Sequence, residues 1–185
     1  MNQSENKEML SIEIVEASPE DARPIREVQY NTWLATYPNE EYGITLDDIH
    51  DRFKGSFDEK IKKSEETIRN LPEGQRYVVA KNNGRVIGFA ISRKHEDKNQ
   101  LHAIYVLPEF QATGIGKRLW EQACQIFDST KDTVVEVASY NSPAIEFYKK
   151  LGFEETGKEF TDENFKMKSG AILPETILVK KAMQS

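Results

Sequence analysis

Residues 100–119 read QLHAIYVLPEFQATGIGKRL, and this stretch is the most informative in the chain. The apolar-rich segment 100–106 predicts a strand, and apolar residues at helical spacing predict a helix from Gly114 to about Phe127. The start of a helix presents backbone N–H groups without helical partners, and the helix dipole adds partial positive charge there. Because Gly114 and Gly116 remove side chains from the approach to these groups, the junction suits a phosphate or pyrophosphate.

Two other phosphate-binding motifs do not fit this junction. A P-loop requires an earlier glycine where Gln111 stands, and a Ser or Thr where Arg118 stands. A dinucleotide fingerprint requires a third glycine where Leu119 stands. By itself, a Gly-x-Gly before a helix is compatible with anion binding and equally with a tight helix start.

Outward from this junction, strand and helix patterns alternate along the chain. The other expected strands are 11–17, 76–81, 85–93, 133–138, 153–160 and 171–181, and the other expected helices begin at Ser18, Thr45, Asp58 and Ser142. Asn82-Asn83-Gly84 predicts a tight hairpin turn, since Asn and Gly tolerate positive φ. We therefore expect an α/β fold, a single domain with a mixed sheet flanked by helices on both faces.

Length and composition exclude several classes of protein. The 185 residues suit one domain, expected over residues 11–185 after a flexible polar N-terminus, residues 1–10. The net charge of −6 argues against a nucleic-acid binder, which needs clustered Lys and Arg. Cys124 is the only cysteine, and no His, Asp or Glu cluster has metal-ligand spacing, so we expect no metal. No apolar run approaches a membrane span and no signal-peptide core precedes the domain, so we expect a cytoplasmic protein without a membrane partner.

Two longer motifs give the chain a family resemblance. Val106 to Leu119 fits V-x-P-x-F/Y-Q-x-x-G-I/L-G-K/R-x-L/M and resembles the Gcn5-related N-acetyltransferase (GNAT) superfamily. Asn141 to Phe153 is similar to the family's N-x-x-A-I/V-x-F/L-Y-x-K/R-L-G-F signature, and residues 31–37 resemble its weaker N-x-T/S-W-x-x-x-Y motif. The order and spacing agree over about residues 11–181. The resemblance implies a GNAT fold and transfer of an acetyl group from acetyl-CoA, a cosubstrate, to an amine, with bacterial spermidine/spermine-type members nearest.

The resemblance also implies which residues bind the cofactor. The backbone of Ile104, Tyr105 and Val106 would pair with the pantetheine arm like an added strand. The pyrophosphate would lie against Ala112, Thr113, Gly114, Ile115, Gly116 and Lys117, with Gln111 beside them and further charge from Arg118. The Asn141 side chain would hydrogen-bond the cofactor, although its place before Ser142-Pro143 suits a helix cap equally.

The matched positions imply a catalytic pair. Tyr148, which also contacts the cofactor, would donate a proton or hydrogen bond to the departing sulfur, because a phenol stays protonated at neutral pH. Glu136 is placed like a base of ribosomal-protein N-terminal acetyltransferases and would have a raised pKa if buried among apolar neighbours. Other candidates for the base are His102, Glu40 or Glu41, and a water relay.

The acceptor is expected on the side of Trp33, Tyr37 and Tyr42, whose aromatic faces suit a cationic amine. Segment 39–66 has a local net charge of −4 (five bases and nine acids), which indicates either a solvated helical face or an acidic wall for a cationic substrate. We therefore expect a small primary amine or polyamine as acceptor. The alternatives are a peptide N-terminus or a non-catalytic acyl-CoA-binding module, and a homodimer is possible through the last strands.

Overall fold

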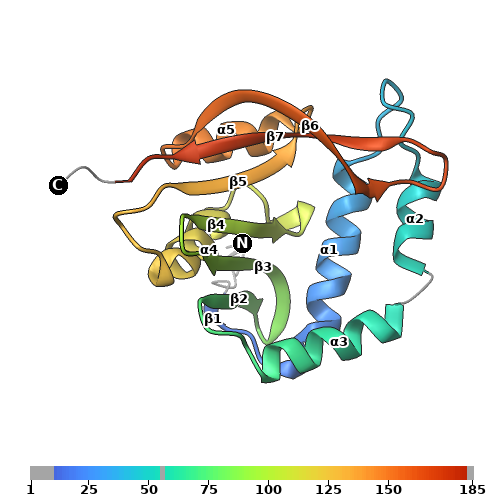
Figure 1. The fold of residues 1–185 in the computed structure, drawn as a ribbon. Coiled ribbons are helices and arrows are strands. Elements are labelled where there is room, and N and C mark those ends of the chain that lie inside the picture. Colours follow the sequence, from blue (N-terminus) through green and yellow to red (C-terminus); the bar gives the residue numbers. More distant parts are fainter. Residues whose placement is uncertain (1–10, 55–56, 183–185) are drawn as a thin grey trace, which may run out of the picture.

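The computed structural model describes residues 11–54 and 57–182 (Figure 1). These residues form one seven-stranded sheet in the order β1-β2-β3-β4-β5-β7-β6. The strands are β1 (Ile12–Glu16), β2 (Gln75–Asn82), β3 (Arg85–Lys94), β4 (Asn99–Val106), β5 (Thr133–Ala138), β6 (Glu154–Lys166) and β7 (Ile172–Lys180). The α-helices are α1 (Ala22–Thr36), α2 (Leu46–Lys54), α3 (Phe57–Arg69), α4 (Ile115–Ala123) and α5 (Ser142–Lys150). The expected mixed α/β sheet is thereby confirmed.

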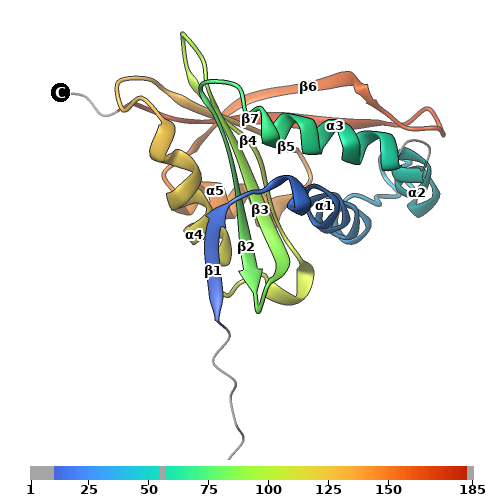
Figure 2. The ribbon, with the colours of Figure 1, turned by 90° about the horizontal axis from the view of Figure 1, so that it is seen from below.

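The sheet separates two layers of helices. In Figure 2, α4 and α5 lie on one side of the strands, and α1, α2 and α3 lie on the other. Gly88 of β3 is one reason that α4 packs closely, because a Cβ there would lie 2.9 Å from the Tyr105 carbonyl oxygen and 3.2 Å from a Leu119 methyl group. No helix in residues 11–54 and 57–182 is long and apolar enough to cross a membrane.

Local signals account for most element boundaries. Ser18 and Asp21 form a capping box around a 3-10 turn, Pro19–Asp21, which leads into α1. Asn83 and Gly84 adopt φ values of 49° and 81° in the β2–β3 hairpin, as their residue types predict.

Two boundaries differ from the sequence-based expectation. The expected helix from Gly114 to Phe127 is α only to Ala123 and continues as a 3-10 turn, Cys124–Ile126. The penultimate strand was expected over 153–160 but runs to Lys166, because β6 continues beside β7 as far as the Lys166–Ile172 pair. Its extension brings Phe165 over Trp33, at 6.2 Å between ring centroids, so long-range packing stabilises a segment that local sequence leaves undecided.

The apolar residues form two clusters. The larger cluster joins the strands to α4, α5 and the first half of α1. The smaller cluster lies under α2 and the β6–β7 end and includes Trp33, Tyr37, Phe53, Ala138 and Leu173. Residues from both clusters meet at Tyr105, which packs against each of them. Tyr105 lies on β4 beyond Leu101, the last residue of that strand to pair with β5.

Candidate active site at the open end of the β4–β5 seam

The strands β4 and β5 are the only parallel neighbours among the described strands, and they pair over a short stretch. Their register covers Asn99–Leu101 against Thr133–Val135 and goes no further. The next residue, His102, is an extra residue in β4 relative to β3, because Leu101 pairs with Ser92 and Ala103 with Ile91. A bulge of this kind bends a strand and increases its twist, so β4 turns away from β5 at His102. We call the paired part of β4 and β5 the closed end and the remainder the open end.

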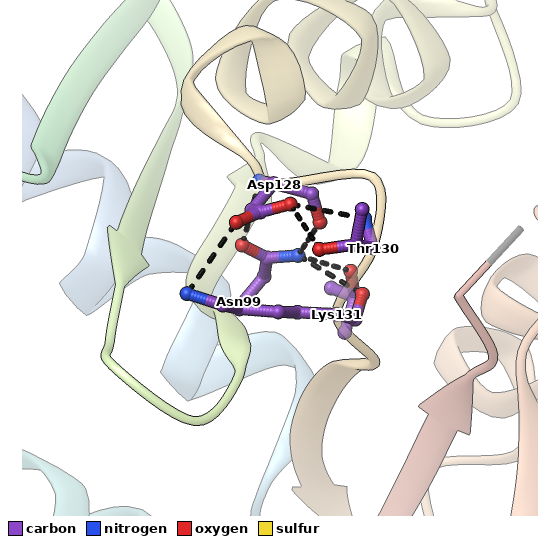
Figure 3. A network of polar contacts seen from close by, with 5 residues as sticks. Asn99, Asp128, Thr130 and Lys131 are labelled. Atoms are coloured by element: carbon purple, nitrogen blue, oxygen red, sulfur yellow. Dashed lines mark hydrogen bonds and ion pairs between the residues drawn. The ribbon is translucent and has the colours of Figure 1, made fainter.

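A polar network fixes the closed end (Figure 3). Asn99, 1% exposed, donates from Nδ2 to the carbonyl oxygens of Asp128 at 2.8 Å and Lys131 at 3.2 Å, and its Oδ1 accepts from the Asp128 N–H at 3.0 Å. The Asp128 carboxylate in turn accepts from the N–H and hydroxyl of Thr130. One buried amide side chain thus attaches β4 to the loop that leads into β5.

The backbone of β4 is available along the open end. The Leu107 N–H donates to the Ile87 carbonyl oxygen at 2.9 Å, so alternation along the antiparallel pair directs the backbone groups of Ile104 and Val106 to the other edge. The backbone of Tyr105 was also expected to pair with the pantetheine arm, but it faces β3, opposite Phe89. Tyr105 instead places its hydroxyl beside Trp33 and Tyr37. The Gln111 side chain donates to the Val106 carbonyl oxygen at 3.0 Å and holds the following loop against this edge.

The loop before α4 has the geometry of an anion site. Ala112 and Gly114 adopt positive φ values of 59° and 86°, and no side chain caps the first turn of α4. The free N–H groups of that turn, after a residue in left-handed conformation, form a concavity that suits a phosphate. Thr113 supports the loop by donating from Oγ1 to the Phe110 carbonyl oxygen at 2.6 Å. Gly116 allows α4 to approach α5, because a Cβ there would lie 3.2 Å from the Phe147 ring.

The two basic residues of this loop have different roles. Lys117 is exposed and lies 3.8 Å from Glu121, so its ammonium is free to swing toward an anion. Arg118 was expected to add charge to the anion site, but its guanidinium donates to the Ile12 carbonyl oxygen of β1 at 2.9 Å. Arg118 therefore ties α4 to the edge of the sheet.

A group of tyrosines fills the open end from the α1 face. Trp33 Nε1 donates to the Tyr105 hydroxyl at 3.2 Å, and the Tyr37 hydroxyl lies 3.4 Å from the same oxygen. Tyr140 donates from its hydroxyl to the Tyr37 carbonyl oxygen at 2.7 Å, and Tyr42 stacks on Tyr140 at 5.1 Å between ring centroids. Trp33 and Tyr37 are buried, whereas Tyr42 is 37% exposed, so only Tyr42 of the three expected acceptor residues reaches solvent.

Tyr148 enters the same region from the α5 face. Its ring packs against Phe147 and Phe153 in the main core, and 5% of the residue is exposed. Desolvation raises the pKa of Tyr148, and the nearby Tyr105 raises it further, so the phenol stays protonated at physiological pH. Tyr148 can therefore pack its ring in the core and still keep a protonated hydroxyl that is able to donate.

Asn141 caps α5, as one of its two interpretations predicted. Its Oδ1 accepts from the Ala144 N–H at 3.3 Å. Its Nδ2 has no hydrogen-bond partner among the described residues and remains able to donate to a ligand.

The carboxylate that the fold buries at the open end is Glu175 of β7, a residue outside every motif recognised in the sequence. Glu136 is exposed, so the burial on which its expected role depended is not met. Glu175, paired with Ala138 of β5, is 7% exposed. Desolvation, followed by the charges of Glu136 and Asp162, raises the pKa of Glu175 to about 7, while Arg52 opposes the shift. The only sequence signal was a single acid in the strand ILPETILVK.

The other candidates for the base lie in less suitable places. His102 is at the β4 bulge, and its residue surface is exposed. Desolvation of the ring by nearby protein, followed by the charge of Arg93, lowers the pKa of His102, so its imidazole is a weaker base. Glu40 and Glu41 are exposed in the turn after α1.

Segment 39–66 does not present a simple acidic wall. Asp48 is buried and accepts from Thr45 and Ser169, while Asp51 and Asp58 pair with Lys168 and Arg23. The residue of α2 that turns toward the open end is basic: Arg52 lies 5.1 Å over the Trp33 ring and donates to the Asn164 carbonyl oxygen. The negative charge near the tyrosines comes from Glu136, Asp162 and Glu175 of β5, β6 and β7.

Known proteins with similar sequences and structures are acetyltransferases. The chain is 29% identical over 121 residues to the peptidyl-lysine N-acetyltransferase YjaB of Salmonella typhimurium, covering 64% of this chain and 76% of that protein. It is 32% identical over 87 residues to the N-alpha-acetyltransferase RimI of Mycobacterium tuberculosis, covering 44% and 53% respectively. The structure superposes on the PaiA N-acetyltransferase of Thermoplasma acidophilum in complex with coenzyme A with a TM-score of 0.69, at 25% identity, over 93% of this chain and 99% of that one.

The family itself follows from a match that spans most of the chain. Residues 26–153 match the model of the acetyltransferase (GNAT) family, and this range contains the loop before α4, the open end of β4 and β5, and Tyr148. The chain therefore belongs to the acetyltransferase (GNAT) family.

Proposed function

We propose that this protein transfers an acetyl group from acetyl-CoA to a primary amine at the open end of the β4–β5 seam. One observation carries the proposal: the seam lies between an uncapped anion site on the α4 side and a tyrosine–carboxylate group on the α1 side. The two sides suit the two substrates of such a transfer. When bound, acetyl-CoA supplies a thioester whose carbonyl carbon is open to attack by an amine.

The residues present fit an extended, anionic acyl carrier. The edge groups of Ile104 and the N–H of Val106 can pair with amide groups of a pantetheine arm, as in strand addition, while the Val106 carbonyl oxygen accepts from Gln111. The loop from Ala112 to Lys117 can hold a pyrophosphate through its backbone N–H groups, and Asn141 Nδ2 can donate to the carrier between these two sites. The PaiA structure, which contains coenzyme A, supports this assignment.

We assign Tyr148 the role of the acid. No hydrogen bond among residues 11–54 and 57–182 involves its hydroxyl, and its raised pKa keeps the proton in place. The hydroxyl can therefore donate to a departing sulfur that gains negative charge. Tyr105 and Tyr37 line the opposite side and would orient the incoming amine.

For the acceptor, we infer a small primary amine or polyamine. The support is the carboxylate group of Glu136, Asp162 and Glu175 beside aromatic rings, which together suit a cationic amine. A peptide N-terminus or lysine is the second candidate, because YjaB and RimI are named for such acceptors and the exposed Tyr42, stacked on the half-buried Tyr140, offers a surface for a chain. The cytoplasmic location and the homodimer stay predictions.

A CoA-release assay over polyamines, amino sugars, amino acids and peptides with free N-termini or lysines tests the function. We expect at least one small amine to give turnover that saturates with both substrates. Preference for peptides over every small amine would favour the second candidate. Binding of acetyl-CoA without CoA release on the whole panel would contradict the enzyme proposal and support a non-catalytic binding module.

A further inference from the structure

We propose that Glu175 is the general base, which removes a proton from the ammonium group of the acceptor before attack. This inference rests on the proposed acetyl transfer and names a catalytic residue for it. It assigns to Glu175, on the neighbouring strand β7, the role that the family resemblance implies for Glu136.

The position of Glu175 follows from the register of three strands. Glu175 is opposite Ala138 of β5 and Phe160 of β6, and side chains of directly opposed residues point to the same face of a sheet. Ala138 and Leu173, two residues before Glu175, both belong to the smaller cluster with Trp33 and Tyr37. The carboxylate therefore points to the α1 face, at the end of the seam where β5 leaves β4.

Glu175 has free hydrogen-bonding capacity despite its burial. Its Oε2 is fully shielded from solvent and has no hydrogen-bond partner among the described residues. A buried polar atom without a partner costs stability, and such costs are retained where a ligand supplies the missing partner. An incoming ammonium group has the charge and the donors to do so.

The groups around Glu175 come from every neighbouring element. Glu136 of β5 and Asp162 of β6 disfavour its charged form, and Arg52 of α2 favours it. On the open side, its charge acts on the phenols of Tyr37, the residue that caps the C-terminus of α1, and Tyr105 of β4; burial raises the pKa of both phenols, and the charge of Glu175 adds to the shift. With a pKa of about 7, the Glu175 carboxyl is neutral below that pH and becomes a carboxylate, able to accept a proton, above it.

The proposed proton transfers balance. Glu175 accepts one proton from the ammonium, which leaves an amine with a free electron pair. That pair forms the bond from nitrogen to the acetyl carbon, and the carbon–sulfur bond breaks. Tyr148 gives its proton to the sulfur and regains one from the nitrogen. Glu175 then releases its proton to solvent.

The test compares Glu175→Gln with Glu136→Gln and a control, Glu154→Gln, an exposed residue at the far end of β6. With the amine identified in the CoA-release screen, we expect Glu175→Gln to lower kcat at pH 8 by about 10²-fold or more and to abolish the low-pH limb of the kcat profile. Glu154→Gln should keep that limb unchanged, and Glu136→Gln should keep it at a lower pH, because the Glu136 charge raises the pKa of Glu175. An independent measurement is an NMR pH titration of the ¹³C-labelled glutamate carboxyl carbons. One resonance of the wild-type protein should titrate near pH 7, and it should be missing only from the spectrum of Glu175→Gln.

Each outcome decides the inference. If Glu175→Gln keeps the low-pH limb, or if Glu136→Gln loses it instead, Glu175 is not the base, while acetyl transfer by this protein stands. If the wild-type protein releases no CoA with any amine, the proposed function and the inference both fail. A Glu175→Gln protein that binds acetyl-CoA like the wild type excludes misfolding as the cause of lost turnover.

Discussion

The two ends of the β4–β5 seam use the same pair of strands for opposite purposes. At the closed end, the side chain of Asn99 satisfies three backbone groups. At the open end, β4 keeps its edge groups at Ile104 and Val106 without a strand partner, and Glu175 is buried with one oxygen unpaired. The contrast separates an end where buried polar groups are paired from an end where they are left without protein partners, as is common at functional sites.

Replacing Tyr148 by Phe tests the open end and should have the largest effect. The ring packing against Phe147 and Phe153 is retained and only the proton donor is lost, so we expect kcat to fall by about 10²- to 10³-fold with little change in stability. Steady-state kinetics at saturating substrates measures the loss. Tyr77→Phe, on the distant strand β2, is the matched control and should keep full activity. Undiminished turnover of Tyr148→Phe across pH would rule out the acid role.

Replacing Asn99 by Ala tests the closed end. The change removes one hydrogen bond from each of three part-buried backbone groups. The Lys131 carbonyl oxygen and the Asp128 N–H lose their partner, while the Asp128 carbonyl oxygen keeps the Lys131 N–H at 3.1 Å, so we expect the free energy of unfolding to fall by about 2–4 kcal/mol. Urea denaturation measures it, and Thr130→Ala, at the exposed edge of the same network, should cost less than about 1 kcal/mol. Turnover per folded molecule should stay close to wild type. A large loss of kcat in a folded Asn99→Ala protein would show that the two ends are not separable.

Measuring the free energy of unfolding as a function of pH tests the burial of Glu175 without any substrate. Because its pKa is raised in the folded state to about 7 from 4.5, the folded protein binds this proton more tightly than the unfolded chain. The stabilisation is complete below about pH 4.5 and is lost as the pH rises through 7. We expect Glu175→Gln to gain about 2 kcal/mol of stability relative to wild type between pH 5 and pH 8. A constant difference, like that expected for Glu154→Gln, would contradict this.

The smallest expected effect concerns the anion loop. Gly114 has a φ of 86°, and no atom lies within 4 Å of the place that a Cβ would occupy, so Gly114→Ala introduces backbone strain and no clash. We expect a loss of about 1 kcal/mol in stability and a several-fold rise in KM for acetyl-CoA. Gly84→Ala, with a φ of 81° in the distant β2–β3 turn, should cost similar stability but leave KM unchanged. An equal KM for both variants would argue against pyrophosphate binding at this loop.

Much of the fold was predictable because its signals are local. The Asn82-Asn83-Gly84 turn, the Ser18 capping box and the strand-to-helix junction at Gly114 depend on residues close in sequence, and each predicted element appears. The two long motifs were equally decisive, since residues 26–153 match the GNAT family. The prediction of an N-acetyltransferase that uses acetyl-CoA is confirmed at the level of the family. Which amine accepts the acetyl group remains a proposal.

The charge of the acceptor side was harder to predict. The sequence has an excess of acids in segment 39–66, but several of them have protein partners. Asp48 accepts a hydrogen bond from Thr45, and Asp51 and Asp58 form ion pairs with Lys168 and Arg23 respectively. Only folding decides which groups meet, because the partners of these acids are up to 121 residues away along the chain. The buried acid of the site is contributed instead by a strand that composition did not distinguish.

The sequence alone determined the order of elements, the anion loop and the position of Tyr148 in its motif, because these depend on residue types at fixed short spacing. The tertiary structure decided which acid is buried near the tyrosines. Glu136 and Glu175 both stand in alternating strands, and nothing in either strand predicts that the first is exposed and the second buried. Burial depends on the pairing of β7 with β5 and on the cover that α1 and α2 provide, and burial is what raises the pKa of Glu175 into the range of a base.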